Sequence, residues 1–296
     1  MNGYRLMRAL LSPIYKFWYR PKVIGKENIP QEGAIILAGN HIHLMDQCNV
    51  IISTKRKLHY MAKKEYFDDY KVAWFFRLVG CIPVDRSKKD ENAKAAAIDV
   101  LSKGHALGIF PEGTRNGLKK ENAKKIYDKY FFDMSFKKFY KKIRKNKTSF
   151  ILYLEELMNN GVITELDYLN NLFNVDKYLK ELIEKEVITI DDYYDHILLP
   201  LKYGAVSMAH KTNALIVPYA IGGNYKFRGK NLIVKIGEPF KVDDDLEKAN
   251  LELDNKIKDL LKEIDKKVTN NVKWISLLYI GLFFYVIILI GDLHDK

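Results

Sequence analysis

The chain has 296 residues, which is long enough for one large domain or two small ones with a buried core. Its composition, 48% hydrophobic and 29% charged, is that of a globular protein. The net charge of +12 favours an anionic partner such as a membrane surface, a phosphorylated substrate or nucleic acid, without choosing among them. The two cysteines, Cys48 and Cys81, exclude a disulfide framework and predict free thiols in a reducing compartment.

Residues 1–20 predict a basic amphipathic helix. Its apolar face carries Met7, Leu10, Leu11, Ile14, Phe17 and Trp18, and its polar face carries Arg5, Arg8, Ser12, Lys16 and Arg20. Such a helix suits the headgroup boundary of an anionic membrane, although packing of the same face on the main domain explains the pattern equally well. We expect Pro13 to kink or split the helix. No cleavage site of a secretory signal is present, so we expect this segment in the mature protein.

Strands that alternate with helices predict an α/β domain. Three apolar runs predict buried strands and a fourth, more alternating run predicts an edge or half-exposed strand; in chain order they are Ala34–Ala38, Leu107–Pro111, Ala214–Ala220 and Leu232–Ile236. Helical stretches at 70–80 and 91–104 lie between the first two strands, and the second stretch ends on a glycine suited to a C-cap. Polar motifs follow two of the strands, where open α/β sheets place their sites.

The first polar motif is NHIHLMD, residues 40–46, in which Asp46 lies five positions after His41. An imidazole can take a proton from an alcohol when a carboxylate holds it in the right tautomer, and a turn from strand into helix would bring the aspartate back to the ring. Alone, the pair is weak, because a surface histidine without a chemical role is more common. A metal site built from His41, His43 and Asp46 ranks lower, since no familiar zinc spacing supports it.

Two cationic motifs follow. GCIPVDR, residues 80–86, ends on Arg86, and FPEGTR, residues 110–115, follows a buried strand. Gly113 lets the backbone approach a ligand closely, and the guanidinium of Arg115 can grip a phosphate with two hydrogen bonds. The apolar run IVPYA, residues 216–220, would suit the lining of an acyl channel, although a buried strand needs no such function.

Residues 122–196 interrupt the α/β pattern. The charged side chains in this part of the chain are segregated: residues 119–147 carry 12 basic and 3 acidic side chains, whereas residues 148–197 carry 3 basic and 11 acidic. The acidic half repeats itself with an offset of 25, since residues 153–169 match residues 178–194 at nine of seventeen positions. Each copy predicts two helices, the second capped by a threonine with an aspartate three residues on. The segment is either a module for protein docking or self-association, or a solvated insertion without a binding role.

Residues 274–291, WISLLYIGLFFYVIILIG, contain no charge. As a helix they would extend about 27 Å, close to the hydrocarbon thickness of a bilayer. Six lysines lie among the 18 residues before this segment and one lies after it, so we expect a transmembrane tail anchor with the bulk of the protein on the cytoplasmic side.

Taken together, the ordered motifs resemble the glycerolipid acyltransferases. Four blocks carry the resemblance, NHIHLMD at 40–46, GCIPVDR at 80–86, FPEGTR at 110–115 and IVPYA at 216–220, with AKKEYF at 62–67 and LKYGAVSMA at 201–209 as further family-like segments. The resemblance implies the family's central sheet flanked by helices. It covers roughly residues 21–240 apart from the insertion.

The resemblance also implies a role for each matching residue. His41 would be the general base on the acceptor hydroxyl and Asp46 the group that orients it. The acceptor phosphate would be bound by Arg86, Glu112, Gly113, Thr114 and Arg115. Lys63 would contact the phosphate or the oxyanion of the tetrahedral intermediate, and Val217 and Pro218 would line the acyl site. No metal and no tightly bound cofactor are implied, because the acyl donor is a substrate, the thioester of coenzyme A or acyl carrier protein.

We therefore expect a phospholipid-synthesis enzyme at the cytoplasmic face of the cell membrane, with the bilayer, a lysophospholipid and the thioester donor as partners and no nucleic acid. The expected acceptor is the sn-2 hydroxyl of lysophosphatidic acid; the rivals are glycerol 3-phosphate or another lysophospholipid as acceptor and, in another class, a non-catalytic membrane adaptor. An intact His41 and Asp46 pair argues against the adaptor. Two departures from the family pattern stand out: His43, where the family often has serine, and the insertion itself.

The expected division of the chain follows from these motifs. It comprises an interfacial helix (1–20), the first part of the acyltransferase domain (21–121), the charged helical insertion (122–196), the second part of the domain (197–268) and the tail anchor (274–291).

Overall fold

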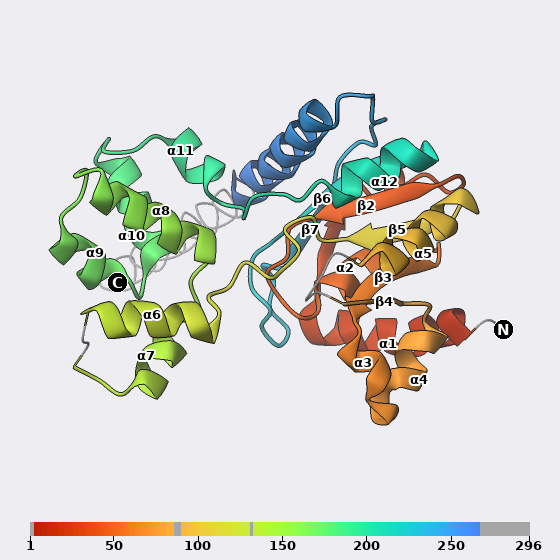
Figure 1. Ribbon diagram of the computed structural model, residues 1–296, viewed down its shortest axis with the longest axis horizontal. Helices are drawn as coiled ribbons and strands as arrows, with labels where there is room; N and C mark the ends of the chain where they lie inside the picture. Colours follow the sequence, from red (N-terminus) through yellow and green to blue (C-terminus); the bar gives the residue numbers. More distant parts are fainter. Residues whose placement is uncertain (1–2, 86–89, 131–132, 267–296) are drawn as a thin grey trace, which may run out of the picture.

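The computed structural model describes residues 3–85, 90–130 and 133–266, which form a mixed α/β fold around a central sheet (Figure 1). Within these residues the strand order is β1-β7-β6-β2-β5-β3-β4. The strands are β1 Lys22–Ile24, β2 Ile35–Gly39, β3 Leu58–Lys63, β4 Ile82–Val84, β5 Ala106–Ile109, β6 Leu215–Gly222 and β7 Ile233–Ile236. Strands β2 to β6 run parallel, whereas β7 is antiparallel to β6 and parallel to β1.

Strand β2 lies at the centre of the sheet, and every one of its residues is buried. Ile35 pairs with Ala106 of β5 on one side and with Leu215 of β6 on the other. A strand covered on both faces needs a continuous apolar run, and IILAG is such a run. The polar residues that begin at Asn40 therefore emerge from the middle of the sheet at the carboxyl ends of the parallel strands.

Helices cover both faces of the sheet. They are α1 Gly3–Tyr19, α2 Asp46–Ser53, α3 Glu65–Asp68, α4 Tyr70–Leu78, α5 Glu91–Ser102, α12 Gly204–Thr212 and a helix at 246–266, with a short 3-10 turn, η1, at Lys26–Asn28. Successive side chains of a strand point to opposite faces, so β2 contributes to two cores. Ile36 belongs to the core that includes α5 and α12, whereas Ile35 belongs to the core that includes Val50 of α2.

Residues 120–195 form a separate group of helices at the left of Figure 1, called the helical lobe below. Its described helices are α6 Lys120–Tyr130, α7 Phe136–Ile143, α8 Thr148–Asn159, α9 Glu165–Asn171, α10 Val175–Glu184 and α11 Ile190–Asp195. The internal repeat corresponds to α8 with α9 and α10 with α11. Thr164 and Thr189 both form complete capping boxes, with Asp167 and Asp192, as the sequence predicts.

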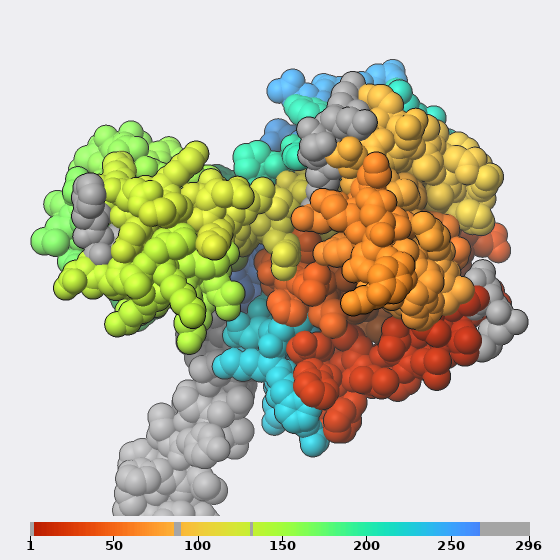
Figure 2. Space-filling model, turned by 60° about the horizontal axis from the view of Figure 1, so that its bottom comes forward, coloured from red at the N-terminus to blue at the C-terminus, as the bar shows by residue number. Residues whose placement is uncertain are grey.

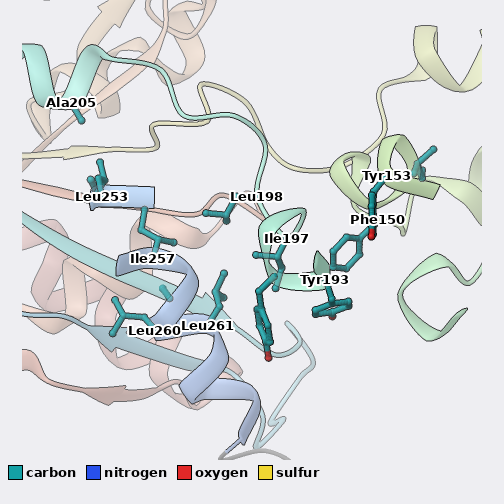
Figure 3. Packing of buried hydrophobic residues seen from close by; sticks show 14 of the residues in the cluster. Phe150, Tyr153, Tyr193, Ile197, Leu198, Ala205, Leu253, Ile257, Leu260 and Leu261 are labelled. Atoms are coloured by element: carbon teal, nitrogen blue, oxygen red, sulfur yellow. The ribbon is translucent and has the colours of Figure 1, made fainter. Parts of the chain in front are cut away.

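The helical lobe shares one apolar core with the α/β part. Phe150 of α8 and Tyr193 of α11 belong to the same buried cluster as Ile257 and Leu261 of the 246–266 helix, with Ile197 and Leu198 between them (Figure 3). The 246–266 helix lies between the lobe and the sheet in Figure 1. Burial of this kind contributes about 25 cal/mol per Å² of apolar surface, so the lobe is anchored by packing and not only by its two connections.

We expected Pro13 to kink or split helix α1; the helix runs unbroken from Gly3 to Tyr19, so Pro13 does not split it. It packs on the α/β part through Tyr4 and Tyr15, which are buried. Its predicted apolar face points away from the α/β part, because Leu10, Ile14, Phe17 and Trp18 are between 49% and 60% exposed. Helix α1 is the red segment at the lower edge of the molecule in Figure 2. The main domain therefore does not cover this face.

Two parts of the sequence-based description need correction. Strand β7 is not an edge strand, because it pairs with both β1 and β6 and three of its four residues are buried. The fold class that we expected also included a transmembrane helix. Among residues 3–85, 90–130 and 133–266 no helix is both long enough and apolar enough to cross a membrane, and the segment 274–291 lies outside these described residues.

Candidate active site

His41 and Asp46 meet where β2 gives way to α2. The chain leaves β2 at Gly39 and turns, and Asp46 is the first residue of α2. This turn brings an oxygen of the Asp46 carboxylate to 2.8 Å from Nδ1 of the imidazole. The same oxygen, Oδ2, accepts the backbone N–H groups of Ile42 at 2.6 Å and His43 at 2.7 Å. We call His41 and Asp46 the dyad, and their predicted proximity is present in the structure.

The geometry assigns the tautomer of His41. A carboxylate accepts, so Nδ1 of His41 carries the proton and donates it to Asp46. The side chain of Asp46 is 0% exposed and that of His41 is 16% exposed. No described residue bonds to Nε2 of His41, which leaves this nitrogen as the acceptor of a proton. A fixed imidazole with a free Nε2 is the arrangement of a general base.

Aromatic side chains support the imidazole. Phe110 stacks on the ring of His41, with centroids 4.0 Å apart and an interplanar angle of 14°. The rings of Tyr60 and Tyr219 lie 5.9 and 6.4 Å from that of Phe110, and both tyrosines are buried. One side of the dyad is therefore apolar and excludes water, which strengthens electrostatic interactions within it.

Side-chain amides fix the backbone around the dyad. Asn40 donates to the Ile221 carbonyl at 2.9 Å and accepts the Ile221 N–H at 2.8 Å, so it continues the ladder between β2 and β6. The backbone N–H of Asn116 donates to the His41 carbonyl at 2.8 Å. These contacts hold the backbone on both sides of the His41 side chain in place.

Glu112 is placed behind the site and not at its surface. It is only 3% exposed, and its two oxygens accept the backbone N–H groups of His41 at 2.8 Å and Leu199 at 2.9 Å. Burial raises the pKa of Glu112 to about 7, against the lowering effect of the bonds from Leu199 and His41. A buried carboxylate with both oxygens occupied repels a phosphate and cannot grip it. The geometry thus differs from the predicted phosphate contact and makes Glu112 a brace for the dyad.

The remaining predicted residues of this turn face outward. Gly113 has φ +70°, a left-handed conformation that favours glycine, and an added Cβ would lie 2.8 Å from Nζ of Lys202. Thr114 is partly buried and Arg115 is exposed. Lys202, which the sequence motifs do not single out, therefore places a cationic side chain against Gly113.

Lys63 lies at the same edge of the sheet. It is the last residue of β3 and is exposed, and β3 is parallel to β5, the strand that leads into the Gly113 turn. The carboxyl ends of parallel strands meet at one edge, so we expect Lys63 on the same edge of the sheet as Arg115, and we call these two side chains with Lys202 the cationic rim. Arg86, the other predicted cation, lies outside the described residues.

Val217 and Pro218 lie inside the sheet. Both are buried in β6, and Val217 is part of the core that also contains Tyr60 and Tyr219. Neither lines the two hollows of about 490 and 500 Å³ found elsewhere in the described residues. One of these hollows lies between the helical lobe and the 246–266 helix, and the other is a basic hollow near Tyr4 of α1. The structure thus places Val217 and Pro218 as packing residues within the sheet.

A family model described as Acyltransferase matches residues 20–222, which is more than half of the chain. The chain belongs to the Acyltransferase family. It is 34% identical over 95 residues to the 1-acyl-sn-glycerol-3-phosphate acyltransferase of Bacillus subtilis (strain 168), covering 32% of this chain and 48% of the relative. It is 36% identical over 96 residues to the protein of that name from Borreliella burgdorferi, covering 32% of this chain and 38% of the relative.

The chain therefore spans about half or less of the length of these curated relatives. A solved structure shows the same fold over a longer range. The crystal structure of the 1-acyl-sn-glycerophosphate (LPA) acyltransferase, PlsC, from Thermotoga maritima has a TM-score of 0.53 and 18% identity, covering 88% of this chain and 79% of that chain. The predicted family resemblance is confirmed, and the dyad, the Gly113 turn and the helical lobe all fall within the matched Acyltransferase range.

The Acyltransferase motifs do not include one residue that contacts the dyad. Tyr225, in the segment after β6, donates its hydroxyl hydrogen to Oδ1 of Asp46, and its ring stacks on His43 with centroids 4.0 Å apart. His43 also accepts the Met45 N–H on Nδ1, at 3.2 Å. Tyr225 and Asp46 are 179 positions apart, so no local pattern could reveal the hydrogen bond between them. The available signal was topological, because Tyr225 follows the strand that pairs with β2.

Proposed function

We propose that this member of the Acyltransferase family moves an acyl group from a thioester to the sn-2 hydroxyl of 1-acyl-sn-glycerol 3-phosphate, giving phosphatidic acid in phospholipid synthesis. The observation that carries the proposal is the dyad, in which Asp46 engages Nδ1 of His41 and leaves Nε2 free. The names of the curated relatives, both 1-acyl-sn-glycerol-3-phosphate acyltransferases, support this acceptor.

In the proposed reaction Nε2 of His41 removes the hydroxyl proton while the acceptor oxygen attacks the thioester carbonyl. The tetrahedral intermediate collapses, the C–S bond breaks, and the imidazolium returns the proton to the departing thiolate. Asp46 holds the ring and stabilises its cationic form. No protein nucleophile is needed. Burial raises the pKa values of Cys48 and Cys81 to about 11, so both thiols are protonated and unreactive at neutral pH.

The cationic rim is the proposed site for the acceptor phosphate. Arg115 is exposed and can bind two phosphate oxygens at once, and Gly113 lets the phosphate approach the backbone. The hydroxyl of Thr114 is a further donor at this turn. Lys63, at the end of the neighbouring strand, would contact the phosphate or stabilise the oxyanion. Arg86 would supply a second guanidinium to the acceptor phosphate.

We further propose that the enzyme works on a membrane surface, the cytoplasmic face of the cell membrane, where a soluble thioester donor and a lipid acceptor meet. The exposed face of α1 supports this location. Trp18 packs edge-on against Phe227 with centroids 4.7 Å apart, and Phe227 is itself 57% exposed, so the apolar surface extends beyond the helix. Lys16 and Arg20 flank it, and exposed aromatic residues with basic neighbours suit an anionic interface.

The test of the chemistry is an acyl-transfer assay on the purified full-length chain. It offers lysophosphatidic acid and glycerol 3-phosphate as acceptors, each with coenzyme A and acyl carrier protein thioesters. We expect transfer to lysophosphatidic acid, lost in His41→Ala and retained in His210→Ala, because His210 lies within 3.9 Å of Asp244 at the surface of α12 and away from the dyad. Transfer that survives His41→Ala would contradict the assignment.

The membrane proposal needs a separate measurement. Replacing Leu10 and Ile14 by aspartate should lower transfer to an acceptor embedded in anionic vesicles and leave transfer to a dispersed short-chain acceptor unchanged. Leu166→Asp is the matched control, because Leu166 is 67% exposed on α9 of the helical lobe. If the double variant transfers to the vesicle-embedded acceptor as fast as the wild type does, a membrane role for α1 is refuted.

A further inference from the structure

The carboxylate of Asp46 is held from two sides. Its Oδ2 accepts from His41 and from two backbone amides, whereas its Oδ1 accepts from the hydroxyl of Tyr225. The side chain of Asp46 is completely buried. Hydrogen bonds replace water around a buried carboxylate, and Tyr225 is the side chain that does this at Oδ1.

Tyr225 is in turn held by a chain of hydrogen bonds. The side-chain N–H of Asn49 in α2 donates to the Tyr225 hydroxyl oxygen at 2.6 Å. The hydroxyl of Tyr15 in α1 donates to the Asn49 side-chain oxygen at 2.8 Å. Every donor in the series Tyr15, Asn49, Tyr225 points toward Asp46. Hydrogen bonds aligned in one direction polarise one another, so each strengthens the next.

We propose that Tyr225 is a positioning residue for the dyad, and that Asn49 and Tyr15 orient its hydroxyl, so that α1 is connected to the general base through a continuous hydrogen-bond relay. The inference rests on the proposed function, because it concerns how His41 acts as a base. Burial raises the pKa values of Tyr225 and Tyr15, so both hydroxyls remain protonated donors throughout the physiological range.

The relay has a direct consequence for α1. Tyr15 is buried on the inner side of this helix, while Ile14 and Phe17 on its outer side are exposed. The position of α1 therefore determines whether Asn49 is held in the orientation that serves Tyr225. The helix that we propose to meet the membrane is also the far end of the relay that ends at Asp46.

Tyr225→Phe tests the relay, because it removes the hydroxyl and keeps the ring that stacks on His43. Without the Tyr225 bond the Asp46 carboxylate carries more localised charge and holds the protonated ring of His41 more tightly. We expect kcat/KM to fall about tenfold and the acidic limb of its pH profile to move to higher pH. Tyr15→Phe should move the limb in the same direction by a smaller amount.

Tyr19→Phe is the matched control. The Tyr19 ring packs against Tyr15 and Tyr225 at centroid distances of 5.2 and 5.4 Å, but its hydroxyl makes no hydrogen bond among the described residues. We expect its activity and pH profile to equal those of the wild type. If the acidic limb of the pH profile moves as far in Tyr19→Phe as in Tyr225→Phe, the shift comes from loosened packing of the rings, and the relay is overturned.

Other titratable groups surround the dyad and stay in place in these variants. His43 lies against Tyr225, and Glu112 binds the His41 amide from behind. Burial lowers the pKa of His43, and the charge of Arg115 lowers it further, while Tyr60 and Tyr219 pack against Phe110. Since none of these is substituted, a moved acidic limb in Tyr225→Phe reports the lost hydroxyl.

A spectroscopic measurement separates the relay from the reaction. Proton NMR of the full chain should show a low-field resonance for the Nδ1 proton of His41, assigned by its loss in His41→Gln. We expect Tyr225→Phe to shift this resonance further downfield and Tyr19→Phe to leave it unchanged. If His41→Ala abolishes transfer but Tyr225→Phe alters neither rate, profile nor resonance, the relay is refuted while the proposed function stands. If His41→Ala leaves transfer intact, the proposed function fails first.

Discussion

The dyad and the helical lobe are stabilised by different kinds of interaction. The backbone around the dyad is held by side-chain hydrogen bonds between residues far apart in the sequence, as Glu112 binds His41 and Leu199 and as Asn40 binds Ile221. The lobe is held by apolar packing around Phe150 and by local caps such as Thr164. We therefore expect the loss of one hydrogen-bonding atom near the dyad to lower activity, and the loss of buried apolar volume in the lobe to lower stability.

The largest expected effect is that of Asp46→Asn. The carboxylate accepts hydrogen bonds from N–H donors, whereas the asparagine amide would place its own N–H group against one of them. The variant would therefore no longer favour the His41 tautomer in which Nε2 is free. We expect kcat to fall about 10³- to 10⁴-fold, as measured by acyl transfer under saturating acceptor. A loss of less than about tenfold would mean that the aspartate is not part of the chemistry, and that the two regions differ less than proposed.

Phe150→Ala tests the other side of the comparison. Phe150 is 0% exposed in the core that joins the lobe to the α/β part. We expect the free energy of unfolding to fall by about 3–5 kcal/mol, measured by denaturant unfolding, while kcat per folded molecule stays unchanged. A fall in kcat that persists after correction for the folded fraction would show that the lobe shapes the site directly.

Glu112→Gln changes a side chain that connects the dyad, through His41, to Leu199 just after the helical lobe. One amide oxygen can still accept, but the amide N–H faces a backbone donor, so we expect a loss of about 1–3 kcal/mol in unfolding free energy.

The pH dependence of the same variant is informative. The pKa of Glu112 is about 7 in the folded chain and 4.5 as its ordinary value, so the folded state binds more protons between these limits. This group therefore makes the wild type less stable as pH rises from about 4.5 to about 7, and the variant should lack that slope. Identical slopes for the two proteins, measured by thermal unfolding at stepped pH, would contradict the burial argument.

The smallest expected effect is that of Thr164→Ala. It removes one capping box of the lobe, with an expected loss of about 1 kcal/mol in unfolding free energy and no change in acyl transfer. Thr189→Ala in the second repeat should behave alike, because the two boxes have the same geometry. A marked loss of activity in either variant would show that local caps of the lobe matter to the dyad.

Sequence reasoning succeeded where structure depends on neighbours along the chain. The capping boxes at Thr164 and Thr189 follow from spacing alone, and the fully buried β2 follows from its uninterrupted apolar run. The proximity of His41 and Asp46 also needed only a turn of a few residues. In each case the information lies within about one turn of helix or one strand.

It failed where partners come together only in the folded chain. The role of Glu112 depends on amides at 41 and 199, and no local pattern distinguishes a brace from a phosphate ligand. Tyr225 reaches Asp46 only because β6 pairs with β2. The burial of β7 depends on β1, a strand of three residues too short to predict. Long-range register, not composition, decided these cases.

Asn116 joins the two ends of the helical lobe. Its side-chain N–H groups donate to the Ser149 hydroxyl at 2.9 Å and the Ile197 carbonyl at 3.1 Å, so the chain returns to the place from which it departs. Between two points that already touch, added or lost chain costs little closure entropy. The junction at Asn116 is therefore a natural site for evolution or engineering to exchange one accessory module for another while the dyad stays the same.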